Sequence, residues 1–141
     1  MQELHMPGWF FYVPDNTIPK YNPKKVGKWM YFYRDSEGFE FTRKMCKTAV
    51  ESGTTLEAKV SDNRFQGVAC FYAEIDDIET HKKIITLFLE HKMIRKTKAG
   101  KLYDISFKLD YQTDAGLYGD DFKPELKLSE LMNLNTGEWV K

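Results

Sequence analysis

Apolar and polar residues alternate with a period of two in several short stretches of this chain. Alternation of this kind is typical of β-strands, because successive side chains of a strand point to opposite faces of its sheet. We expect strands over residues 8–13, 27–33, 56–61, 67–75, 102–111 and 123–128, and an edge strand over 136–140. Turn residues such as Asp62 and Asn63 separate some of these stretches, which favours antiparallel pairing.

Two longer stretches have helical spacing instead. Phe41, Met45 and Ala49 recur at intervals that place them on one helical face, and Gly53 follows where a helix commonly ends. The pattern predicts helices over residues 39–51 and 77–91, and a short one over 129–134.

The order of these elements predicts an α+β fold. Its antiparallel sheet would be covered on one face by the two main helices, while the other face stays partly open. A chain of 141 residues, with 42% hydrophobic and 15% aromatic residues, fits a single globular domain over residues 1–141.

Charge and composition exclude several classes of protein. The 21 basic and 21 acidic residues cancel, so no overall charge attracts the chain to duplex nucleic acid or to an anionic membrane. No apolar run has the length of a membrane span, and we expect a cytoplasmic protein. Cys46 and Cys70 each lie in an apolar pattern and have no accompanying ligand motif, so we expect neither a metal site nor a cofactor.

The open face of the predicted sheet holds the candidate functional residues. If Ala58 and Val60 face the helices, Lys59 must point to the opposite face, and the same reasoning places Lys108 there. Two lysines on one sheet face predict a site for a phosphate-bearing ligand. Residues expected to share that face are Ser61, Tyr72, Ser106 and Asp110. The alternative is an ordinary solvated strand surface, where lysine and aspartate serve solubility.

Four short motifs follow one another along the chain. They are Gly27–Met30, Ala58–Ser61, Val68–Tyr72 before an Asp-rich helix start, and Phe107–Asp110 followed by Thr113, Gly116, Leu117 and Tyr118. In this order they resemble the family of the basophilic leukaemia expressed protein, over about residues 24–128. The resemblance implies a fold like that of the cap-binding translation initiation factor 4E, a curved antiparallel sheet backed by helices. It implies little about activity, although some members of that family are labelled as phosphothreonine lyases.

Our first hypothesis is a binding module. Lys59 and Lys108 would hold the phosphate of a nucleotide or short single-stranded nucleic acid while an aromatic ring stacks on a base. Candidates for that ring are Trp29, Tyr31, Tyr72 and Tyr118. The large area of an indole favours a place in the core for Trp29.

Two alternatives remain open. In an enzyme of the lyase type, one of the two lysines would act as a base, its pKa lowered by desolvation and by its like-charged neighbour. No acid for such chemistry is evident, since His81 lies on the second predicted helix, on the wrong side of the sheet. A protein-interaction domain would instead use the aromatic segment Trp9–Tyr12 as its contact surface, although an ordinary sheet strand explains that segment as well.

Overall fold

The computed structural model describes residues 1–116 and 122–141. Its seven-stranded antiparallel sheet has the order β1-β2-β4-β5-β3-β6-β7. The strands are β1 (Gln2–Met6), β2 (Trp9–Val13), β3 (Val26–Tyr33), β4 (Ala58–Ser61), β5 (Gly67–Glu74), β6 (Ser106–Leu109) and β7 (Leu126–Lys127). The helices are α1 (Ser36–Glu51), α2 (Ile78–Glu90), α3 (Asp110–Asp114) and a short 3-10 helix (Leu128–Glu130). The predicted α+β class is confirmed.

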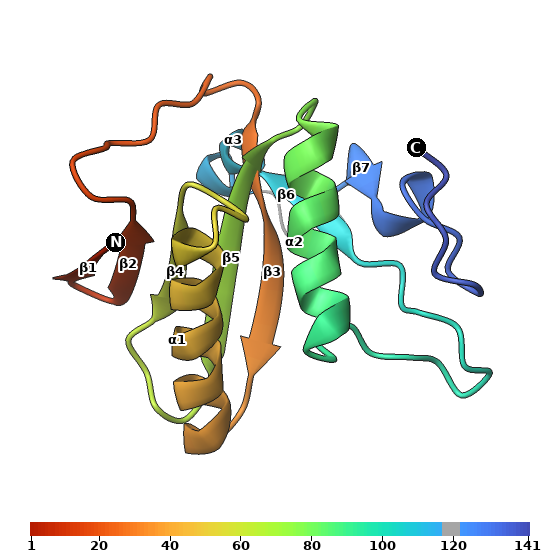
Figure 1. The fold of residues 1–141 in the computed structure, drawn as a ribbon, viewed down its shortest axis with the longest axis horizontal. Helices are drawn as coiled ribbons and strands as arrows, with labels where there is room; N and C mark the ends of the chain where they lie inside the picture. The colour runs from red at the N-terminus through yellow and green to blue at the C-terminus, as the bar shows by residue number, and fades with distance from the viewer. Residues whose placement is uncertain (117–121) are drawn as a thin grey trace.

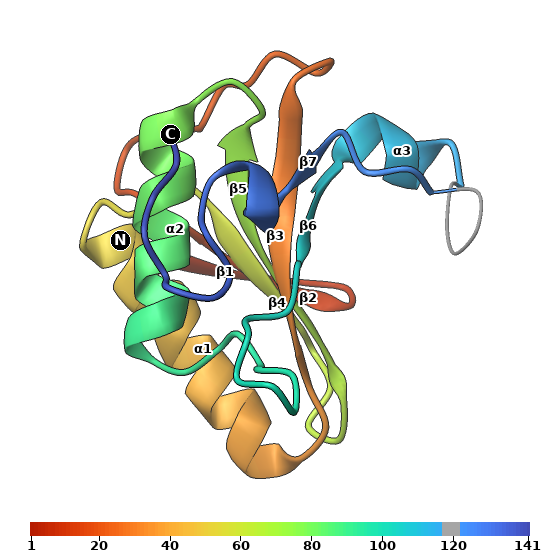
Figure 2. The same cartoon turned by 90° about the vertical axis from the view of Figure 1, so that its right-hand side faces the viewer.

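The sheet separates two unlike sides of the molecule. Helices α1 and α2 lie side by side across one face (Figure 1). In the view turned by 90°, α3 projects on the opposite side of the sheet (Figure 2). Within the described ranges, no helix is long and apolar enough to cross a membrane. We call the side covered by α1 and α2 the helix face and the other side the open face.

Both long helices begin at an aspartate. The side chain of Asp35 accepts a hydrogen bond from the backbone N–H of Gly38 at 2.6 Å, and that of Asp77 accepts one from the N–H of Thr80 at 3.1 Å. These bonds satisfy backbone donors that a helix start leaves without a partner. Helix α1 therefore starts at Ser36, three residues before the predicted start.

The core lies between the helix face and the two long helices. Trp29 is fully buried there, with its ring 5.5 Å from that of Phe107. Its indole N–H donates to Nδ1 of His81 on α2 at 3.0 Å, and Nε2 of His81 lies 2.9 Å from the carbonyl oxygen of Ile75. His81 is therefore neutral with its proton on Nε2, consistent with the burial that lowers its pKa. The preference for Trp29 as a core residue is confirmed.

A glycine in β3 lets β6 approach closely. A Cβ atom at Gly27 would lie 2.6 Å from the backbone oxygen of Lys108 and 2.6 Å from the ring of Phe107. No other residue fits without moving β6, so Gly27 fixes how the Lys108 strand joins the sheet.

The predicted strand over residues 102–111 is too long. Only Ser106–Leu109 forms β6, because its neighbours β3 and β7 pair with no more than these residues. The backbone N–H of Leu109 donates to the side chain of Gln112 at 3.2 Å, and the chain turns into α3 at Asp110. The expectation that Asp110 belongs to the polar face of a strand is therefore wrong.

Both ends of the chain also differ from the prediction. Strand β1 was not predicted, since its residues carry no clear alternation; it forms a hairpin with β2 through Pro7 and Gly8, and Gly8 has a φ of 85°. The helix predicted over 129–134 is the short 3-10 helix, and the strand predicted over 136–140 is a single bridge between Met132 and Trp139.

Candidate functional site

The pairing register places the three lysines of the central strands on the open face. Residues directly opposite each other in paired strands share a face. Lys59 lies opposite Cys70, Tyr72 opposite Lys28, and Lys28 opposite Lys108. Because Cys70 and Tyr72 are two residues apart in β5, all of these side chains belong to the same face.

Lys59 and Lys108 are nevertheless not neighbours. Strands β5 and β3 lie between their strands, so their backbones are roughly 14 Å apart at ~4.8 Å per strand. The prediction that both lysines share one face agrees with this register, but Lys59 and Lys108 are separated by two strands and Lys108 is buried, so they do not form a close pair. The lysine next to Lys108 is Lys28, which the sequence analysis missed although its alternation with Met30 placed it on this face.

Lys28 and Lys108 form a cationic cluster beneath α3. The ammonium group of Lys28 donates to Oδ1 of Asp110 at 2.8 Å and to Oγ1 of Thr113 at 2.7 Å. Both lysines are only 6% exposed. Burial and then the charge of Lys28 lower the pKa of Lys108, and its ammonium group lies 5.1 Å from the ring of Phe122. Asp110 thus serves as an internal counterion for Lys28.

Lys59 has a different environment, surrounded by aromatic rings. Its ammonium group lies 3.9 Å from the ring centre of Trp9, 5.6 Å from that of Phe11 and 5.9 Å from that of Tyr72. Such distances allow cation–π attraction. Lys59, Trp9 and Phe11 are each partly exposed. This aromatic and cationic cluster is therefore accessible to a ligand, unlike the buried Lys28 and Lys108.

An apolar groove continues from this cluster toward the sheet edge. It has a volume of about 600 Å³ and lies between the open side of β1 and β2 and the segment that follows β2. Its lining residues include Leu4, Met6, Phe11, Val13, Ile18 and Pro19. Glu57 is the one carboxylate among its described lining residues. Burial raises the pKa of Glu57, and the charge of Lys59 acts in the opposite direction. Phe11 belongs to both the groove and the Lys59 cluster.

The other predicted site residues have separate roles. The hydroxyl group of Ser61 accepts from the N–H of Val68 at 3.0 Å and donates to its carbonyl oxygen at 3.2 Å, so it serves the β4–β5 hairpin. Tyr72 is buried between the Lys59 cluster and Lys28, and this burial raises its pKa. Ser106 of β6 pairs with Lys127 of β7, at the edge of the sheet. Tyr118 lies outside the described residues.

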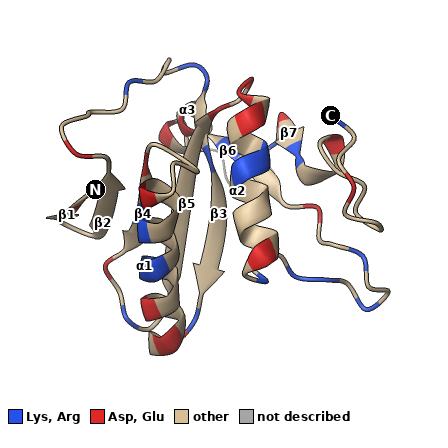
Figure 3. Cartoon of the chain, in the orientation of Figure 1, with Lys and Arg blue, Asp and Glu red and all other residues tan. Residues whose placement is uncertain are grey.

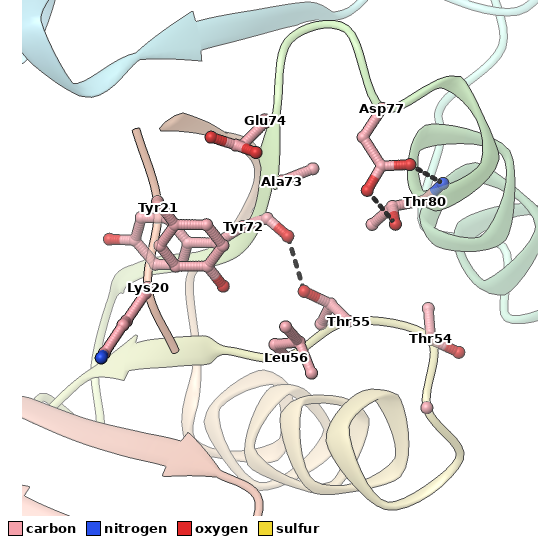
Figure 4. A pocket seen from close by; sticks show the side chains of 11 residues that line it. Lys20, Tyr21, Thr54, Thr55, Leu56, Tyr72, Ala73, Glu74, Asp77 and Thr80 are labelled. Atoms are coloured by element: carbon pink, nitrogen blue, oxygen red, sulfur yellow. Dashed lines mark hydrogen bonds between the residues drawn. The ribbon is translucent and has the colours of Figure 1, made fainter. Parts of the chain in front are cut away.

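A second cavity of about 300 Å³ opens where β5 leads into α2 (Figure 4). Thr55 contributes a hydroxyl group that donates to the backbone oxygen of Tyr72 at 2.6 Å, and Asp77 is occupied in capping α2. The hydroxyl group of Tyr21 is buried and has no hydrogen-bond partner in the described part of the chain. Among the described residues its wall holds Glu74 and Asp77 but only one cation, Lys20, so this cavity suits a phosphate group less well than the Lys59 cluster.

Charges on the helix face are mixed. Both basic and acidic residues occur along the visible sides of α1 and α2, so no single sign dominates there (Figure 3). Among the described residues, no group of His, Cys, Asp and Glu could hold a metal ion, and Cys46 and Cys70 are free and buried.

Neither a scan against models of protein families nor a search of curated proteins finds a match for this chain. The argument for a function therefore rests on the side chains of the open face.

Proposed function

We propose that the open face binds a phosphate-bearing ligand that also carries an aromatic ring, a nucleotide or the end of a short single strand of nucleic acid. One observation carries this proposal: the partly exposed ammonium group of Lys59 lies 3.9 Å from the ring of Trp9, at the entrance to an apolar groove. Cation, exposed ring and groove together match the chemistry of a nucleotide, which joins an anion to a flat apolar base.

Each side chain of the cluster has a role in this proposal. Lys59 would exchange its aromatic contacts for a charge-assisted hydrogen bond to a phosphate oxygen. Trp9 or Phe11 would stack on the base, a contact worth ~1–3 kcal/mol per base in single-strand binding. Glu57, on the groove wall, would accept hydrogen bonds from N–H groups of the base.

The cationic cluster beneath α3 would act at longer range. Lys28 and Lys108 lie on the same face as Lys59 but are buried. Their charges add to the positive potential of the open face, which attracts an anion without touching it. This assignment replaces direct phosphate contact by Lys108.

The observed architecture is compatible with the family resemblance seen in the sequence. An antiparallel sheet with its long helices on one face is compatible with the curved antiparallel sheet backed by helices that the resemblance to translation initiation factor 4E implies. We propose that fold, the relationship to the basophilic leukaemia expressed protein family and the cytoplasmic location as parts of the same hypothesis. Methylated-cap recognition by two tryptophans is not part of it, because Trp29 is in the core.

A lyase-like enzyme is the second candidate, and the lowered pKa of Lys108 favours it. Lys28 would then be the like-charged neighbour that the hypothesis needs. Against the lyase hypothesis, Lys108 is almost fully buried and His81 lies on the helix face.

A protein-interaction surface over Trp9–Tyr12 would be divided between the two faces of the sheet. Only Trp9 and Phe11 are on the open face, since Phe10 and Tyr12 pair with helix-facing residues of β4.

A thermal-shift screen with nucleotides and short oligonucleotides tests the binding hypothesis. A ligand at 100 times its dissociation constant stabilises the folded protein by about 2.7 kcal/mol. We expect such a shift for the wild type, a much smaller one for Lys59→Ala, and an unchanged one for the matched control Lys44→Ala on the exposed side of α1. An equal shift in Lys59→Ala would refute the proposed site. Release of inorganic phosphate from a phosphothreonine peptide, lost in Lys108→Ala, would support the lyase instead.

A further inference from the structure

Strand β1 forms one edge of the sheet and is unusually accessible. All five of its residues are exposed, and among the described residues its outer edge pairs with no other strand. Edge strands of native proteins commonly carry lysine, proline or a bulge that prevents pairing with another chain. The five residues of β1, Gln-Glu-Leu-His-Met, include neither lysine nor proline.

The hairpin geometry shows which backbone groups face outward. A two-residue turn, Pro7 and Gly8, joins β1 to β2. The residues that flank such a turn exchange backbone hydrogen bonds, and bonded and non-bonded pairs then alternate along the strands. Met6, Leu4 and Gln2 therefore bond to β2, whereas the N–H and C=O groups of Glu3 and His5 point away from it.

This outward edge is complementary to itself. If two copies of β1 run antiparallel about a two-fold axis at Leu4, Glu3 lies opposite His5 of the partner subunit. These two positions are the ones whose backbone groups face outward, so each subunit's free donors and acceptors meet those of the other. Leu4 then lies opposite Leu4 of the partner subunit in the closer, non-bonded pair.

We propose that the chain forms a two-fold homodimer in which β1 pairs with β1 of a second copy, giving one continuous sheet across both subunits. The apolar side chains of β1 support the same register. On the open face this register covers Leu4 and Met6, which are 43% and 52% exposed in the single chain. Glu3 and His5 add no ion pair across the axis, because Glu3 contacts Arg43 at 3.0 Å and His5 contacts Asp62 at 2.6 Å within each subunit.

The dimer also joins the two grooves of the open faces. Gln2, Leu4 and Met6 line the groove of one subunit along its β1 side. Because a two-fold axis normal to the sheet leaves both open faces on the same side, the grooves would meet across β1. The dimer does not depend on ligand binding, and either proposal can fail alone.

Disulfide trapping tests the register directly. In the proposed dimer, Leu4→Cys places two thiols in a directly opposed pair, with Cα atoms about 4.5 Å apart, within the range that a disulfide bridges. Gln2→Cys is the matched control, because its thiol would be roughly 13 Å from its own copy. Cys46 and Cys70 are buried and do not compete. We expect a covalent dimer from Leu4→Cys under mild oxidation and little from Gln2→Cys.

Sedimentation equilibrium provides the second test. The wild type should associate to twice its mass of 16.6 kDa as concentration rises. Leu4→Lys, which sets like charges opposite each other at the axis, should remain monomeric. Val140→Lys, a comparable change at an exposed position near the C-terminus and far from β1 (Figure 1), should associate like the wild type. A monomeric wild type at all concentrations, or equal trapping of both cysteine variants, would overturn the proposal.

Discussion

Two tryptophans on opposite faces of one sheet have opposite environments. Trp29 points to the helix face, is fully buried and donates to His81. Trp9 is partly exposed on the open face, against the ammonium group of Lys59. On the helix face Trp29, Phe71 and Phe107 are almost completely buried, whereas the open face holds a lysine and aromatic rings that are partly exposed. We therefore expect the helix face to supply most of the stability, and we propose the open face as the binding side.

The largest expected effect is a difference in stability between variants of the two tryptophans. Trp29→Ala should lower the free energy of unfolding by ~3–5 kcal/mol, as for other buried aromatic side chains. Trp9→Ala should lower it by about 1 kcal/mol or less, the size of an exposed cation–π contact. Urea denaturation of both variants measures the difference. Equal losses would show that the open face is as important for stability as the core.

A smaller effect on stability is expected beneath α3. Asp110→Ala leaves the buried charge of Lys28 without its carboxylate and should cost about 2 kcal/mol, less than the ~3–5 kcal/mol of a fully buried pair because Asp110 is partly exposed. Lys28→Met should cost less, since it also removes the repulsion between Lys28 and Lys108. Urea denaturation that ranks the two variants in the opposite order would contradict the assigned role of Asp110.

Substitution of Lys59 on the open face should change the affinity for a ligand. Lys59→Ala should weaken the binding of a nucleotide by roughly tenfold, or about 1.4 kcal/mol, while leaving the urea midpoint nearly unchanged. Titration calorimetry of wild type, Lys59→Ala and the control Lys44→Ala measures this change. Equal affinity in all three proteins would place the ligand elsewhere.

The smallest effect is a pH dependence of stability from the helix face. Burial lowers the pKa of His81 in the folded state, so the unfolded chain binds a proton first as the pH falls below about 6.5. Stability is therefore complete above that pH and should fall by about 1 kcal/mol between pH 6.5 and 5.5, and the loss ends below the folded pKa. Urea titrations of His81→Leu across this range should show a smaller slope. An unchanged slope would assign the dependence to other groups.

The sequence predicted the helix face better than the open face, for a physical reason. Burial imposes a strict alternation, so Ala58, Val60 and Phe107 could be assigned to the core side and Lys59 and Lys108 to the other. Strand order depends on long-range pairing, which no local pattern specifies. The separation of Lys59 from Lys108 by two strands could therefore not be predicted.

The sequence indicates several features of the open face only weakly. The two-residue spacing of Lys28 and Met30 places both side chains on one face, and this indication was overlooked. Little in the sequence indicates strand β1 or helix α3, since the residues of β1 are all exposed and α3 is only five residues long. The contact of Trp9 with Lys59 depends on the pairing of β2 with β4, which joins segments about 50 residues apart.

The indole N–H signals of the three tryptophans report whether ligands bind the open face. An ¹⁵N-labelled sample gives one signal each for Trp9, Trp29 and Trp139, assigned with Trp9→Phe and Trp139→Phe variants. On titration with a nucleotide we expect the Trp9 signal to move in proportion to saturation, while the signals of Trp29 and Trp139 stay in place. Movement of Trp29 or Trp139 with Trp9 unchanged would contradict the account.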